Sequence, residues 1–121
     1  MATLLVNTGR AVVTNRINGG GTNPQYVAWG TGAGTTGATD TTLFTESGSR
    51  VSGTASQVTT TTTDDTLQVV ATNTAGATLA ITNAGTFDAN SGGNLFVKGD
   101  FSTINLASGD SIQFTVKVQF S

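Results

Sequence analysis

The sequence predicts an all-β protein, an antiparallel β-sandwich or jelly-roll-like single domain with an extended N-terminal arm. The strongest sign is the segment 111–121, where apolar residues occupy every second position: Ile112, Phe114, Val116, Val118 and Phe120. A strand turns successive side chains to opposite faces, so this spacing creates one apolar face, whereas helix faces repeat about every 3.6 residues. Two further observations agree: Thr and Gly dominate the composition, and turn-forming residues recur without a long helical pattern. We expect 111–121 to be the central strand of the sandwich.

The composition limits the classes of function. The chain has 121 residues, which suits one domain, and its charged residues make up only 10% with a net charge of -2. Nucleic acid needs a basic stripe for its phosphates and an anionic membrane needs a polybasic patch, so we expect neither as a partner. There are no cysteines, which excludes disulfides and thiolate metal sites. No apolar run approaches the roughly 20 residues that span a bilayer.

The first 24 residues differ from the rest, and we divide the chain into residues 1–24, an N-terminal arm with a Gly-rich connection, and residues 25–121, the β-sandwich domain. Three consecutive glycines, Gly19 to Gly21, precede Pro24 and make a flexible connection. The segment before them is either an arm that packs away from the body or a first strand followed by a long loop. Its start lacks the basic residues of a signal peptide, so we expect assembly in the cytoplasm.

The middle of the chain reads as strands joined by loops. Residues 25–30 form a strand with the only Tyr and the only Trp, and residues 31–40 form a long loop. Asp40 is placed to cap a single helical turn over 41–46, with Leu43 and Phe44 inserted into the edge of the sandwich. Residues 49–63, rich in Thr, Ser and Val, are expected to form one long strand.

The second half alternates strands and turns in the same way. Gly92 and Gly93 supply the positive φ that a tight hairpin loop requires. The expected elements are a turn at Asp64 and Asp65, a returning strand at 67–73, a strand at 78–87 with a bulge at 83–84, a hairpin loop at 88–94, a strand at 95–101 and a turn at 105–110.

Motifs that resemble catalytic or binding sites are weak here, and we expect no enzyme, no cofactor and no metal. Residues 32–37 match G-x-G-x-x-G, but no helix follows them and no acidic residue lies about 20 positions on. Residues 88–99 begin like a calcium loop and end in Gly where a Glu belongs. Without His a Ser–His pair is impossible, and a Ser–Lys pair would have to use Lys98 or Lys117.

Tyr26 and Trp29 could form an aromatic platform for a sugar. They lie three positions apart, so in a flat strand their side chains point to opposite faces. One of them is then expected in the core and the other at an edge or interface.

Several pieces, taken in order, resemble a known group of proteins. They are residues 13–19 (VTNRING), 24–32 (PQYVAWGTG), 40–46 (DTTLFTE), 80–89 (AITNAGTFDA), 93–95 (GNL) and 101–111 (FSTINLASGDS). Together they are similar to small virion proteins of tailed bacteriophages, the β-sandwich capsid decoration (cement) proteins and related tail-associated proteins. The similarity covers about residues 13–120. Where the group often has Leu before the Phe of a "GLFD" turn, this chain has Thr86, a change that bears on packing only.

The resemblance implies a structural virion protein that binds the outer capsid surface and stabilises contacts between major capsid subunits. The implied partners are the major capsid protein and the chain itself, as a homo-oligomer, a trimer in preference to a dimer, and the implied location is the virion. The alternative is a receptor- or carbohydrate-binding module of a phage tail fibre. The group has no defined active-site residues. We expect the capsid or oligomer interface to use Leu4, Leu5, Val6, Arg10, Arg16, Tyr26 and Trp29.

Overall fold

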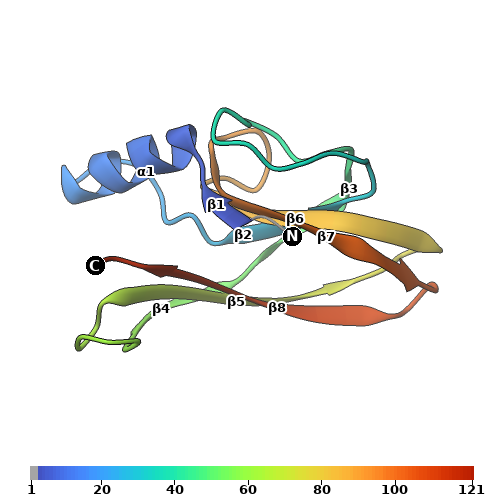
Figure 1. Ribbon diagram of the computed structural model, residues 1–121. Coiled ribbons are helices and arrows are strands. Elements are labelled where there is room, and N and C mark those ends of the chain that lie inside the picture. Colours follow the sequence, from blue (N-terminus) through green and yellow to red (C-terminus); the bar gives the residue numbers. More distant parts are fainter. Residues whose placement is uncertain (1–2) are drawn as a thin grey trace.

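The computed structural model describes residues 3–121 and shows two antiparallel sheets packed face to face, with one helix at an end (Figure 1). The larger sheet has five strands in the order β1-β7-β6-β2-β3, and the smaller has three in the order β4-β5-β8. The elements are β1 (Thr3–Leu5), α1 (Asn7–Ile17), β2 (Tyr26–Gly30), β3 (Glu46–Ser52), β4 (Thr54–Val58), β5 (Thr66–Thr74), β6 (Leu79–Phe87), β7 (Leu95–Leu106) and β8 (Ser111–Gln119). The all-β sandwich is therefore confirmed, while the jelly-roll description stays a prediction.

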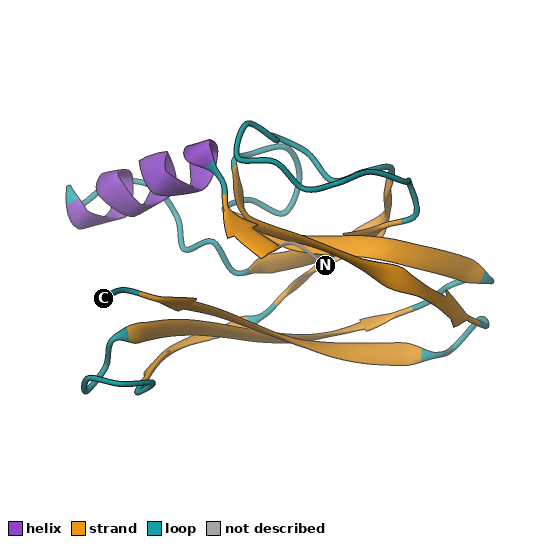
Figure 2. Cartoon of the chain, viewed as in Figure 1, coloured by secondary structure: helices purple, strands orange, loops and turns teal. Residues whose placement is uncertain are grey.

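The N-terminal segment differs from the extended arm that we expected. Residues Thr3–Leu5 form β1, which pairs antiparallel with β7, and the next residue, Val6, is fully buried. Asn7–Ile17 then form α1, so the expectation of an extended arm is wrong over these residues (Figure 2). The helix has no side-chain N-cap, and packing of its buried side against the sandwich holds it. This segment belongs to the body of the protein.

The expected long strand at 49–63 is divided in two. Gly53 separates β3, in the larger sheet, from β4, in the smaller one, so the chain crosses between the sheets here. A Cβ on Gly53 would lie 2.8 Å from the carbonyl oxygen of Val70, and its N–H donates to the carbonyl of Gln25 at 2.7 Å. Only glycine fits this close approach of backbones at the corner.

The C-terminal strand has the predicted faces but not the predicted position. In β8 the polar residues are exposed and the apolar ones half-buried, alternating from Ser111 to Gln119. Among residues 3–121 this strand pairs with β5 alone, so it is an edge strand and our expectation of a central strand is wrong. Alternation marks one wet face of a sheet and carries no information about which neighbours a strand has.

The turns are mostly where the sequence places them. The hairpin loop at 88–94 joins β6 to β7, and Gly92 and Gly93 have φ values of 64° and 70°, as predicted. Asp64 and Asp65 lie in the connection between β4 and β5. The pairing of β6 with β7 is irregular next to Asn83, as expected for a bulge. The helical turn over 41–46 is absent, and the Asp40 carboxylate instead accepts a hydrogen bond from Lys98.

The core lies on both faces of the larger sheet. Val27 and Trp29 point toward the smaller sheet, where Trp29 packs edge-on against Phe114 with ring centroids 6.2 Å apart. The residue between them, Ala28, points to the opposite face, which the loop before β3 covers with the buried side chain of Leu43. Figure 1 shows this loop lying over the outer side of the larger sheet.

Candidate protein-binding surfaces

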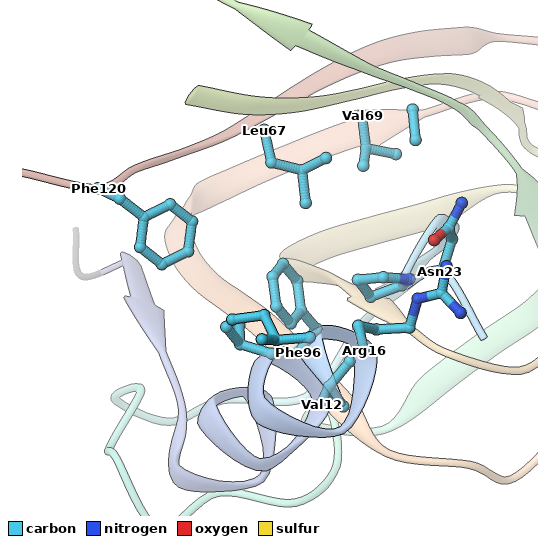
Figure 3. A pocket seen from close by; sticks show the side chains of 11 residues that line it. Val12, Arg16, Asn23, Leu67, Val69, Phe96 and Phe120 are labelled. Carbon is cyan, nitrogen blue, oxygen red and sulfur yellow. The ribbon is translucent and has the colours of Figure 1, made fainter. Parts of the chain in front are cut away.

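An apolar groove lies where α1 covers one end of the sandwich. It has a volume of about 320 Å³ and runs between the helix and the smaller sheet (Figure 3). Its lining is almost entirely apolar, with Arg16 and Asn23 at the side: the apolar members are Val12, Val13, Ile17, Pro24, Ala55, Leu67, Val69, Phe96 and Phe120. A concave apolar surface of this kind suits the side chains of a protein partner better than it suits water.

Three contacts fix α1 against β7 and so shape the groove. The hydroxyl of Thr8 donates to the carbonyl of Leu95 at 2.7 Å. Gly9 is buried, and a Cβ at this position would overlap the carbonyl oxygen of Phe96, so the helix backbone lies directly on the strand. Val12, one turn further, is also buried and packs with Phe96. The helix is therefore held on β7 and forms one wall of the groove.

The structure divides the seven expected interface residues into three sets. Arg10 and Arg16 are exposed on α1, and Leu4 on β1 is 36% exposed. The half-buried pair is Leu5 and Tyr26. The fully internal pair is Val6 and Trp29, at 0% and 4% exposure, so these two side chains lie in the core of the single chain and not on its surface. Of the seven only Arg16 lines the groove.

Two exposed apolar residues were missed by the sequence reasoning. Ile17, the last residue of α1, is 82% exposed, and Phe120, just after β8, is 50% exposed. Both line the groove although they lie at opposite ends of the chain. The apolar residues of 7–17 show no marked helical spacing, so the sequence carries no local signal for the exposed position of Ile17.

Arg16 is exposed, and its side chain also holds the Gly-rich connection that follows α1. Its Nη1 donates to the carbonyl oxygens of Gly20 and Gly21, at 3.3 and 2.9 Å. These contacts fold the Gly-rich connection back onto the end of α1. The connection is therefore a shaped part of the surface beside the groove.

Lys98, considered as a partner for a serine nucleophile, is a structural residue. Its ammonium is fully buried and donates to the Asp40 carboxylate at 2.8 Å and to the carbonyl of Thr42 at 2.9 Å. It also lies 3.3 Å from the centre of the Phe44 ring. The hydrogen bond from Lys98 is the main reason that the pKa of Asp40 is lowered, followed by the bond from the N–H of Gly37. An ammonium held in this way has no room for a substrate.

The segments that resemble a phosphate-binding motif and a calcium loop are ordinary loops in the structure. Residues 32–37 lie in an irregular segment with no helix after it, where the N–H of Thr36 donates to the Asp100 carboxylate at 2.9 Å. In the hairpin loop, the Asp88 carboxylate accepts hydrogen bonds from the backbone and side chain of Asn94. Over residues 3–121 no three His, Cys, Asp or Glu residues gather as a metal site would require.

Comparisons with known proteins give no relative: no family model, no curated protein and no solved structure matches the chain. Within the described part of the chain, no helix has the length and apolar character needed to cross a membrane.

Proposed function

We propose that this protein is a capsid decoration (cement) protein of a tailed bacteriophage, which binds the outer capsid surface and stabilises contacts between major capsid subunits. The proposal rests on the resemblance of residues 13–120 to that group, and the fold is the sandwich that the resemblance implies. The observation that carries it is the apolar groove at the α1 end, with Ile17 and Phe120 exposed at its sides. Such a surface serves adhesion to another protein.

The charges around the groove agree with a protein partner of neutral or acidic character. Arg10 and Arg16 are exposed on α1, whose first turn carries no acidic residue. The whole chain has a net charge of -2, so α1 presents the opposite sign to the rest of the molecule. A charge pattern of this kind orients a protein as it approaches its partner. A homo-oligomer, a trimer in preference to a dimer, is part of the same proposal.

The alternative function, a receptor- or carbohydrate-binding module of a tail fibre, has less support. A sugar site is usually built on an aromatic ring with an accessible face, and Trp29 is 4% exposed while Tyr26 packs against the core cluster of the outer face. Among residues 3–121 Phe120 is the most exposed aromatic residue, and it borders an apolar groove with few hydrogen-bonding groups.

The test is binding to empty capsid shells built from the major capsid protein of the same phage. Deleting the first 18 residues would remove β1 and α1 and unfold part of the core, so a surface substitution is the sharper variant. We expect Ile17→Asp to lower occupancy on the shells at least tenfold in co-sedimentation. Ala77→Asp, at an exposed apolar position in the turn between β5 and β6 away from the groove, is the control and should bind normally.

Two results would overturn the proposal. One is full occupancy of the shells by Ile17→Asp, which would remove the groove from the interface. The other is a failure of the wild-type protein to bind shells while it binds host cells or a glycan array, which would favour the tail-fibre alternative. Copy number in purified particles separates the same alternatives, because decoration predicts many copies and a tail fibre few.

A further inference from the structure

Within residues 3–121, the edge of β8 that faces away from β5 is a row of backbone groups with no strand beside it. At both ends of the strand, even-numbered residues bond toward β5: the N–H of Ala75 donates to the carbonyl of Asp110, and the N–H of Phe120 donates to that of Asp65. The register between β5 and β8 is continuous, so the alternation of an antiparallel ladder applies throughout. The N–H and C=O groups of the odd-numbered residues, 111 to 119, therefore point away from β5, where no strand follows within the described chain.

A hollow of about 460 Å³ lies beside this edge, between the two sheets. One side of it is formed by β8, through Phe114 and Val116, and the opposite side by the inner face of β1, β6 and β7. The lining also includes Thr115 and Lys117, so the hollow reaches the free edge. It lies where a fourth strand of the smaller sheet would face the five-stranded sheet.

The inner face of the larger sheet is built from small residues at this place. Thr3, Gly99 and Ala84 lie side by side in register on β1, β7 and β6, and all three line the hollow. Side chains of large residues normally fill the space between the sheets of a sandwich. A row of small ones leaves room for side chains that another chain supplies.

We propose that β8 accepts an extended segment of a partner polypeptide, which adds a fourth strand to the smaller sheet and inserts apolar side chains, at alternate positions, into the hollow. This is β-strand addition, in which backbone hydrogen bonds give affinity and side-chain pockets give specificity. The site is distinct from the groove at α1, and the inference stands whether or not the partner of that groove is a capsid.

The occupant is a segment without a sandwich of its own. If a second copy supplied its β8 side by side, the apolar face of that strand would already be covered by the larger sheet of its own protomer. The two larger sheets would then have to occupy the same space above the pair of β8 strands. An extended segment of another protein has no such sheet and fits beside the edge.

The outer face of the added strand should carry an acidic residue. Lys117 points outward on β8, and the salt bridges between described residues, Arg50–Glu46 and Lys98–Asp40, do not involve it. A carboxylate on the neighbouring strand directly opposite Lys117 would complete a cross-strand pair. The inferred partner segment therefore alternates apolar and polar residues, with Asp or Glu opposite Lys117.

A synthetic peptide tests this directly. The sequence of residues 111–119 has its apolar residues symmetrically about Thr115, so as a peptide it can align antiparallel to β8 with apolar side chains facing the hollow. In that register position 113 of the peptide lies opposite Lys117 of the protein. The probe is this peptide with Gln113→Glu and a fluorescent label, and the controls are the unchanged peptide and a scrambled one. Binding is measured by fluorescence anisotropy.

We expect the Gln113→Glu peptide to bind at least tenfold more tightly than the scrambled peptide. Lys117→Ala in the protein should abolish its advantage over the unchanged peptide. Thr115→Pro in the protein removes an N–H from the free edge and no bond to β5, so the fold should persist while binding falls at least tenfold. If the proline variant fails to fold, Ile104→Asp tests the same site, because it places a charge at a 40% exposed position that lines the hollow. It should also lower peptide binding at least tenfold.

Three results would overturn the inference. Equal affinity for the scrambled peptide would show that binding does not depend on the alternating pattern and register of the peptide. Full binding by a folded Thr115→Pro or Ile104→Asp variant would place the peptide elsewhere. A protein that dimerises on its own at micromolar concentration, and becomes monomeric with Thr115→Pro, would make a second copy the occupant.

Discussion

Lys98 and Asp40 tie the loop over the outer face to the middle of the larger sheet. The Lys98 ammonium, 0% exposed, donates to the Asp40 carboxylate at 2.8 Å, while the Asp40 side chain remains 23% exposed. The two partners therefore differ in their access to water. The same ammonium contacts the carbonyl of Thr42 and the ring of Phe44, so one side chain holds several points of this loop.

This asymmetry predicts opposite sensitivities for the two partners. Asp40→Asn leaves a buried ammonium without its counter-ion and should lower the free energy of unfolding by about 3 kcal/mol. Lys98→Met replaces the ammonium by an apolar side chain of similar length, and the remaining carboxylate reaches water, so the loss should be about 1 kcal/mol or less. Urea denaturation of both variants measures the difference. Equal losses would show that water reaches Lys98.

The same pair predicts a loss of stability in acid. Hydrogen bonds from Lys98 and Gly37 lower the pKa of Asp40 below its usual 3.8. A carboxyl group whose pKa is lower when folded contributes stability above its unfolded pKa, and this contribution is lost as the pH falls through the folded value. The free energy of unfolding should therefore fall below about pH 4 in the wild type, and fall less in Asp40→Asn. Urea denaturation of both proteins at pH 6 and pH 3 tests this. An equal drop in the free energy of unfolding between the two pH values in both proteins would contradict it.

The strands and turns could be predicted because each has a local cause. Alternation marks β8, and the pair Gly92 and Gly93 marks the hairpin loop. The helix could not be found from propensity, because Asn7–Ile17 contains Gly9, two valines and several Thr and Asn residues. It forms because Val12 and Gly9 are buried against β7, which is a tertiary cause.

The surfaces were harder to predict than the strands. A strand pattern shows which face is wet but gives no strand order, so nothing local shows that β8 lies at an edge. Lys98 lies between Val97 and Gly99 in the sequence, and its burial depends on Asp40, which lies 58 residues earlier. Trp29 looked like an interface residue because aromatic side chains serve both cores and interfaces.

Gly9 is predicted to be the least replaceable residue of α1. A Cβ here would overlap the carbonyl of Phe96 and lie 2.8 Å from the side chain of Leu5. Gly9→Ala should lower the free energy of unfolding by about 1–3 kcal/mol, because the helix must move away from β7. Gly76→Ala is the matched control, since nothing lies within 4 Å of its Cβ position. Thermal unfolding followed by circular dichroism compares the two, and equal midpoints would contradict the close packing.

Asp65 is predicted to organise the turn between β4 and β5. Its carboxylate accepts hydrogen bonds from the N–H groups of Thr60, Thr61 and Thr62, at 2.8, 3.1 and 3.0 Å, and these bonds hold its pKa far below the usual value. Asp65→Ala should speed hydrogen exchange of those three amides at neutral pH. Asp64→Gly is the control: this residue has φ of 58°, which glycine adopts readily. Unchanged exchange in Asp65→Ala would show that the backbone alone holds the turn.

Arg50 is predicted to anchor the hairpin loop between β6 and β7. Its guanidinium lies 3.5 Å from the centre of the Phe87 ring, and Nη1 donates to the carbonyls of Ala89 and Gly92 at 2.8 and 2.7 Å. Arg50→Lys keeps the charge but cannot reach both carbonyls and Glu46 with a planar fork, so stability should fall by about 1–2 kcal/mol. Glu46→Gln should matter less, because its side chain is 29% exposed. Hydrogen exchange across residues 88–94 should rise in Arg50→Lys and stay near the wild-type rate in Glu46→Gln. The reverse order would mean that the ion pair, and not the two carbonyl contacts, holds the loop.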